Sequence, residues 1–227
     1  MTRAILLPGM DGTGQLLKEF AAALAPEFDT LIVSYPKDVA LDYPALIVFV
    51  RDLLPSGERF VLIAESFSGP VAIGLAATKP EGLIGVVMCA SFASTPRPRL
   101  KHFVRLFQAL PLQHLPVRLA MPVLMGRWSS PDWSRRVQGT LRAIAPIVLR
   151  HRLDDVGTVN MAALVTDIDC PLLYLKASND RLVLADSWRV IHDASRNASC
   201  IEIEGPHFLL QAKPQECAVE IKRCFAS

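Results

Sequence analysis

The sequence predicts an α/β protein in which a mostly parallel sheet of about six strands is flanked by helices. Two observations lead to this fold class. Short apolar runs of strand length alternate along the chain with segments of helical periodicity, which is the order that produces a parallel sheet. The apolar runs are also continuous in Ile, Leu and Val, as expected for strands that are buried on both faces.

The first half of the chain is expected to supply four strands and three helices. Apolar residues at 16, 17, 20, 21 and 24 form one helical stripe and mark the first helix. In chain order, the expected segments are strand 3–7, helix 15–25, strand 30–35, helix 43–54, strand 60–64, helix 68–78 and strand 83–90.

The next segment, residues 96–166, interrupts this alternation, and we call it the insertion. It is rich in proline, and a structureless loop of this length would be unusual in a compact protein. We therefore expect a small helical lid over the carboxyl edge of the sheet. Helical patterns in the insertion cover 98–110, 131–150 and 156–166. The sheet domain is then formed by residues 1–95 and 167–227.

After the insertion the alternation resumes and completes the sheet. The expected segments are strand 172–177, helix 186–194, strand 199–203 and helix 208–224. Parallel sheets of this kind bind ligands beyond the carboxyl ends of their strands. The loops that follow the strands are therefore where chemistry is expected.

Composition excludes several classes of protein. Hydrophobic residues make up 51% and charged residues 20% of the 227 residues, which excludes a disordered chain. No apolar stretch reaches the roughly 18 residues of a membrane span, and Pro8 and Gly9 end the first apolar run before a signal-peptide core could form. The five cysteines show no C-x-x-C pair and no zinc spacing. We expect buried reduced thiols, a cytoplasmic protein, and no metal or cofactor.

The stretch FVLIAESFSGPVAIG at residues 60–74 predicts a strand, a tight turn and a helix, with Ser66 at the tip. The pattern is close to G-x-S-x-G, the nucleophile elbow, with Ala64 and Ser68 in place of its glycines. Small residues suffice at these positions, because strand and helix approach closely there. Ser66 is therefore the candidate nucleophile, and Ser68 is expected to cap the following helix.

A nucleophilic serine requires an imidazole base and a carboxylate that orients it. Asp180 follows the strand at 172–177, and His207 follows the strand at 199–203. All three side chains are thus expected at one edge of the sheet. The loop after the strand at 83–90 offers no carboxylate, which favours Asp180 as the acid. Each residue alone would more often be structural; the three together carry the hypothesis.

The order Ser66, Asp180, His207 is that of the α/β-hydrolases, which the chain resembles along its whole length. It resembles a compact member that lacks the first two strands of the family fold and begins at the third. The segment LPGMDGTG at 7–14 is similar to the oxyanion loop of esterase, thioesterase and acyltransferase members, with Pro8 in place of the usual His. The resemblance implies an oxyanion hole built by the backbone N–H groups of Met10 and Phe67.

The charge of the insertion is the one feature that speaks to the substrate. Between residues 96 and 152 there are eleven Lys and Arg residues and one acidic residue, Asp132, so this stretch carries +10 in a chain of +2. It is either a solvated surface or a surface that steers an anionic partner such as CoA, a carrier protein or an acidic lipid. A nucleic-acid partner is not favoured, because aromatic residues are not interleaved with the charges. Apolar residues expected to line an acyl pocket, or to form the core of the insertion, are Phe103, Phe107 and Trp128.

These residues predict a serine hydrolase that cleaves a carboxylic ester or thioester through an acyl-enzyme. Three alternatives stay open. The first is an acyltransferase in which an alcohol replaces water, and the second is a hydrolase of C–C or peptide bonds. The third is a non-catalytic binding module with the same fold, since fold alone does not determine function.

Overall fold

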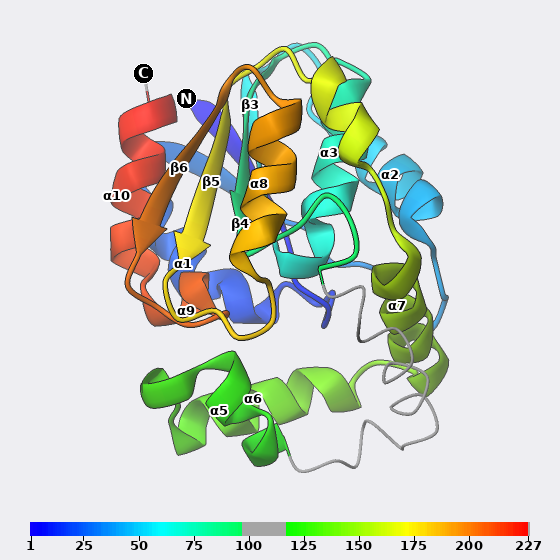
Figure 1. Cartoon of the computed structure of the whole chain (residues 1–227), viewed down its shortest axis with the longest axis vertical. Helices are drawn as coiled ribbons and strands as arrows, with labels where there is room; N and C mark the ends of the chain where they lie inside the picture. The colour runs from blue at the N-terminus through cyan, green and yellow to red at the C-terminus, as the bar shows by residue number, and fades with distance from the viewer. Residues whose placement is uncertain (97–116, 227) are drawn as a thin grey trace.

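The computed structural model describes residues 1–96 and 117–226, which are built around one parallel sheet (Figure 1). Its strand order is β2-β1-β3-β4-β5-β6, and all pairings are parallel. The strands are β1 (Thr2–Leu7), β2 (Phe28–Ile32), β3 (Phe60–Glu65), β4 (Leu83–Cys89), β5 (Leu172–Ala177) and β6 (Ala198–Ile203). The predicted fold class is confirmed.

Helices cover both faces of this sheet (Figure 1). Against one face pack α2 (Tyr43–Arg51), α3 (Gly69–Ala77) and α8 (Ala185–Ala194). Against the other pack α1 (Lys18–Leu24), α9 (Leu209–Ala212) and α10 (Pro214–Phe225). Across the described part of the chain, no helix has both the length and the apolar character needed to cross a membrane.

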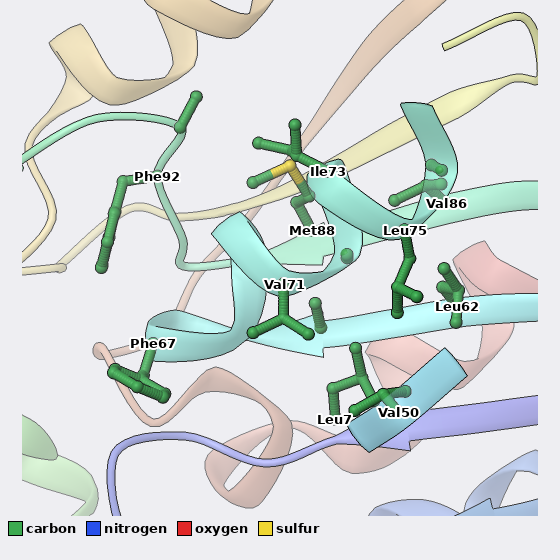
Figure 2. Packing of buried hydrophobic residues seen from close by; sticks show 14 of the residues in the cluster. Leu7, Val50, Leu62, Phe67, Val71, Ile73, Leu75, Val86, Met88 and Phe92 are labelled. Atoms are coloured by element: carbon green, nitrogen blue, oxygen red, sulfur yellow. The ribbon is translucent and has the colours of Figure 1, made fainter. Parts of the chain in front are cut away.

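The larger apolar cluster lies between the sheet and α3. Figure 2 shows Leu75 of α3 close to Leu62 of β3, with Val71 one turn earlier on the same helix, and all three are fully buried. The helix is apolar on nearly every side because it is covered by the sheet, by α2 and by the segment that leads back to β5. Burying a side chain of this size contributes about 1.5–3 kcal/mol. The helix α3 is therefore a rigid support for the turn between β3 and α3.

The described elements between β4 and β5 are all helical. They are α5 (Met121–Leu124), α6 (Pro131–Arg142) and α7 (Pro146–Thr158), with 3₁₀ turns at Val117–Leu119, Gly126–Trp128 and Ala162–Asp167. In Figure 1, α5 and α6 lie across the end of the sheet toward which β5 and β6 point. The helix expected at 98–110 lies outside the described residues.

Prolines divide two helices that the sequence predicted as continuous. The segment 131–150 is split into α6 and α7 before Pro146, and 208–224 is split into α9 and α10 before Pro214. Proline lacks the N–H of a helical hydrogen bond and its ring displaces the preceding turn. Both prolines occupy the first turn of the new helix, where neither cost applies. The helix expected at 156–166 was also wrong: it is the end of α7 followed by a 3₁₀ turn.

The second strand begins and ends a few residues earlier than predicted. The sequence favoured 30–35, whereas β2 is Phe28–Ile32, beside β1 at the edge of the sheet. An edge strand is only partly buried, so Asp29 can stay exposed within it and the apolar run no longer marks its limits. The cysteines also differ from expectation. All five are free, but only Cys89 and Cys217 are buried, and Cys224 is exposed.

Candidate active site

Ser66 lies at the sharp turn between β3 and α3. Its φ of 47° is in the left-handed region, which is strained for a residue with a side chain. A single 3₁₀ turn, Ser66–Ser68, joins the strand to the helix. Gly69 follows, and a Cβ there would lie 2.0 Å from the Ser91 hydroxyl oxygen and 3.0 Å from the Phe92 carbonyl oxygen. The elbow therefore requires a residue without a side chain at position 69, and the backbone that follows Ser66 is tightly packed.

The structure brings the three predicted triad side chains within hydrogen-bond distance. Ser66 Oγ lies 2.9 Å from His207 Nε2, and His207 Nδ1 lies 2.9 Å from Asp180 Oδ2. The side chains of His207 and Asp180 are only 4% and 6% exposed. A carboxylate only accepts hydrogen bonds, so Nδ1 carries the ring proton and donates a hydrogen bond to Asp180. Nε2 is then free to accept from the Ser66 hydroxyl, as the triad chemistry requires.

Asp180 is held by its own loop. The amides of Leu182 and Val183 donate to Asp180 Oδ1 at 2.8 and 2.9 Å. The other carboxylate oxygen therefore faces the imidazole and cannot rotate away without losing both hydrogen bonds. This turn follows the end of β5 directly, and His207 follows the neighbouring strand β6.

The loop after β1 lies beside the elbow, because β1 and β3 are neighbours and Leu7 pairs with Ala64. Met10 is in this loop, and Phe67 directly follows Ser66. The Phe67 amide is in the first turn of a 3₁₀ helix, whose N–H groups have no acceptor within the turn. The fully buried Phe67 ring stacks on Tyr43 with 5.0 Å between ring centroids. The structure thus places both expected oxyanion donors at the same sheet edge as Ser66.

Ser68 ties the loop to the elbow, and it does not cap α3 as expected. No cap hydrogen bond forms from its side chain. Its hydroxyl instead donates to the Pro8 carbonyl and accepts from the Tyr35 hydroxyl at 2.7 Å. The hydroxyl is fully buried and engaged in two hydrogen bonds, which link the loop, the elbow and Tyr35.

Glu65, immediately before the nucleophile, was missed by sequence reasoning. Its side chain is 4% exposed, and its Oε1 has no hydrogen-bond partner among the described residues. The pKa of this carboxyl is raised to about 7, chiefly by burial and also by Asp11, against the lowering effects of Gln211, His207 and the Gly9 backbone. The amide atoms of Gln211 make no hydrogen bond among the described residues. We therefore discount the lowering effect of Gln211 and attribute the raised pKa of Glu65 to burial. An acid that ends an apolar strand was the available signal.

Arg152 was also missed, because it was counted among the surface charges of the insertion. Only 2% of it is exposed, and its guanidinium donates to the carbonyls of Met10, Asp11 and Pro36. Nothing in its local sequence, RHRLDD, distinguishes it from the exposed Arg150.

The remaining charges of the insertion are partly neutralised. Arg127 pairs with Glu204, Arg136 with Glu19 at 2.6 Å and Arg135 with Asp132 at 3.2 Å. Four of the counted basic residues lie outside the described residues, namely Arg97, Arg99, Lys101 and Arg105. The described part of the insertion therefore carries less unpaired positive charge than the sequence count predicts. Two of the acids that pair with it, Glu204 and Glu19, belong to the sheet domain.

Of the three expected substrate-binding residues, Trp128 is described and Phe103 and Phe107 are not. Trp128 is half-buried in an apolar cluster that includes Met125 and Phe208, the residue after His207. Arg127 lies over its ring, 4.4 Å from the centroid. Within residues 1–96 and 117–226, no group of three His, Cys, Asp or Glu side chains is placed to hold a metal.

A family model described as "Alpha/beta hydrolase family" matches residues 4–220. No curated protein sequence matches the chain. Among solved structures, a lipase-esterase related protein from Clostridium acetobutylicum ATCC 824 is similar with a TM-score of 0.82 at 17% identity, covering 99% of this chain and 94% of that one.

Two further structures are similar over nearly the whole chain. A hydrolase from Oleispira antarctica has a TM-score of 0.84 at 14% identity, covering 98% of this chain and 91% of its own. A thermophilic esterase from Thermogutta terrifontis has a TM-score of 0.82 at 16% identity, covering 99% and 89%. At such identities the likeness concerns the fold.

Proposed function

The chain belongs to the alpha/beta hydrolase family, and within it we propose a serine hydrolase that cleaves a carboxylic ester or thioester through an acyl-enzyme intermediate. The observation that carries this proposal is the continuous path of hydrogen bonds from Asp180 through His207 to Ser66. A strained serine at a strand–helix turn, joined to a buried imidazole and carboxylate, is an arrangement that serves nucleophilic catalysis.

The chemistry follows from the positions of these atoms. Ser66 Oγ attacks the acyl carbonyl while His207 Nε2 takes its proton, and the Asp180 carboxylate stabilises the imidazolium. The N–H groups of Met10 and Phe67 bind the oxyanion. When the tetrahedral intermediate collapses, the carbon–oxygen or carbon–sulfur bond breaks and His207 gives its proton to the leaving group. Water, deprotonated by His207, then attacks the acyl-enzyme and releases the acid and Ser66.

We propose that the insertion acts as a lid on a sheet domain formed by 1–95 and 167–227. Two hydrogen bonds support this role. The Phe208 amide donates to the Leu124 carbonyl at 3.1 Å, and Arg181 Nη1 donates to the Pro122 carbonyl at 3.1 Å. The α5 segment thus contacts the residues that directly follow His207 and Asp180.

We further propose that the acyl group lies against the apolar cluster around Trp128, with Phe103 and Phe107 as additional candidates. An anionic leaving group such as CoA, a carrier protein or an acidic lipid headgroup would suit the basic insertion. No cofactor is required by this chemistry. The free cysteines are typical of a reducing compartment such as the cytoplasm.

The test is the intact mass of the protein after reaction with a fluorophosphonate. We expect one adduct on the wild type and on Ser68→Ala, and none on Ser66→Ala. Hydrolysis of a panel of acyl esters and acyl-CoA by the wild type then defines the substrate class. If the folded wild type forms no adduct and hydrolyses none of these compounds, the non-catalytic binding module becomes the better reading. If acyl groups pass to an added alcohol faster than to water, the acyltransferase reading replaces hydrolysis.

A further inference from the structure

The side chain of Arg152 joins α7 of the insertion to the loop that follows β1. Its Nη1 donates to the carbonyl oxygens of Met10 at 2.9 Å and Asp11 at 3.0 Å. Its Nη2 donates to the carbonyl oxygen of Pro36 at 3.1 Å, in the loop that follows β2. One guanidinium therefore holds two loops from neighbouring strands, and one of them carries the proposed oxyanion donor.

The guanidinium contacts backbone oxygens and aromatic rings. Burial has the largest effect on the pKa of Arg152 and lowers it, whereas the nearby carboxylates of Asp11 and Asp155 raise it. Across the described residues, no carboxylate lies within ion-pair distance of it. The rings of Tyr35 and Phe67 lie 5.7 and 5.9 Å from its central carbon. A buried arginine is ordinarily paired directly with an acid, whereas the hydrogen bonds of Arg152 go to three carbonyl groups.

The loop is shaped to receive the guanidinium. Gly12 has a φ of +67°, and a Cβ on it would lie only 2.3 Å from Arg152 Nη1. The Gly12 amide also donates to the Gly9 carbonyl at 2.9 Å, and the Gly12 carbonyl accepts from the backbone amide of Tyr35 at 2.8 Å. Met10 thus lies within the turn from Gly9 to Gly12, and Gly12 packs directly against the Arg152 guanidinium.

We propose that Arg152 is a positioning residue that holds Met10 in the conformation in which its N–H group binds the oxyanion. The Met10 carbonyl is fixed by Arg152, and the turn from Gly9 to Gly12 is closed by its own hydrogen bond. The amide between these two points has little freedom left. The inference rests on the proposed function, since an oxyanion arises only if the chain carries out acyl transfer.

The consequence concerns the rate of the chemical step. An oxyanion donor acts on the tetrahedral species and not on the bound ester, so its displacement lowers kcat and leaves KM nearly unchanged. Loss of one donor lowers kcat by about 100- to 1,000-fold in a well-studied serine protease. Because Arg152 acts through the loop, we expect a loss of about 10- to 100-fold. Lysine carries the charge, but its compact ammonium lacks the planar fork with which Nη1 and Nη2 of Arg152 reach the carbonyls of two separate loops, so it should not restore the rate.

The experiment compares Arg152→Lys and Arg152→Ala with Arg150→Ala, an exposed arginine on the same helix. Initial rates are measured on the best ester of the panel, with thermal melts for each variant. We expect kcat to fall in both Arg152 variants while KM stays within about twofold, and the control to match the wild type. Inhibition by a boronic acid, which forms a tetrahedral adduct on serine, should weaken in parallel with kcat. Added guanidinium at millimolar concentration should partly restore the rate of Arg152→Ala.

Outcomes that overturn the inference are distinct from failure of the proposed function. If the wild type neither labels at Ser66 nor hydrolyses esters, the proposed function fails and this inference with it. If the wild type is active and folded Arg152→Lys keeps the wild-type kcat and boronic acid affinity, only this inference fails. A rise in KM alone would also contradict it, because that result indicates ground-state substrate binding. Arg152→Lys decides the question if Arg152→Ala does not fold.

Discussion

Replacing Glu65 with glutamine should make the stability of the protein less dependent on pH. The carboxyl of Glu65 has a pKa of about 7 in the folded protein, chiefly because it is buried, whereas the ordinary value is 4.5. Between these two pH values the folded state keeps a proton that the unfolded state has lost. The resulting stability is fully present below about pH 4.5 and is lost as the pH rises through about 7.

The magnitude follows from the pKa difference. A pKa raised from 4.5 to about 7 corresponds to about 3 kcal/mol of stability, of which about 2.5 kcal/mol is lost between about pH 5 and about pH 8. Glutamine has the same shape and no ionisation, so Glu65→Gln should lack this loss. We therefore compare the free energy of unfolding of the variant with that of the wild type at each pH. This difference should be more favourable to the variant by about 2 kcal/mol or more at about pH 8 than at about pH 5.

The assay is urea unfolding at several pH values, followed by fluorescence and circular dichroism together. The matched control is Glu81→Gln, which removes an exposed carboxyl and should retain the wild-type pH dependence. Asp11 and Asp155 also have raised pKa values from burial and are present in all three proteins, so Asp155 cancels in the comparison and Asp11 contributes only through its effect on Glu65. If Glu65→Gln loses stability with pH as steeply as the wild type does, the carboxyl is already ionised when buried and the reasoning is refuted.

Three further predictions concern the elbow and the triad. Asp180→Asn should lower kcat by about 1,000- to 10,000-fold, because an amide in place of the carboxylate no longer selects the tautomer in which Nε2 accepts from Ser66. Steady-state kinetics of the variant and the wild type measure this loss, and a loss below tenfold would contradict the prediction. Gly69→Ala should destabilise the fold by about 1–3 kcal/mol through overpacking against Ser91, and an unchanged urea midpoint would mean that the elbow is looser than its contacts indicate. Ser68→Ala should cost about 1–3 kcal/mol by leaving the Tyr35 hydroxyl and Pro8 carbonyl unpaired, while labelling at Ser66 persists; loss of that labelling would reverse the roles of the two serines.

The sheet could be predicted from the sequence because its central strands are local patterns. The core strands β1, β3, β4 and β5 are continuous apolar runs, and alternation with helices leaves a parallel arrangement as the simplest way to bury them. The prediction was least accurate where burial is partial, as in β2 at the sheet edge. It also joined helices across Pro146 and Pro214, although the restriction of proline to a helix's first turn was itself a local signal.

The candidate triad was likewise accessible, for a topological reason. Residues that follow parallel strands meet at one edge, so Ser66, Asp180 and His207 could be assigned to one site without knowledge of any distance. The structure brings them within hydrogen-bond range, while their catalytic roles stay a prediction for the labelling experiment.

The sequence by itself determined the fold class, the order of the elements and the side chains that gather beyond the strands, since these depend on periodicity and on strand ends. Only the tertiary structure decided that Arg152 is buried against the carbonyls of Met10 and Asp11 while Arg150 faces solvent, and that Glu65 ionises with difficulty. Both properties depend on which distant segments surround a charge. Desolvation and hydrogen bonding are set by that surrounding, and two arginines two positions apart share almost the same local sequence but not the same spatial neighbours.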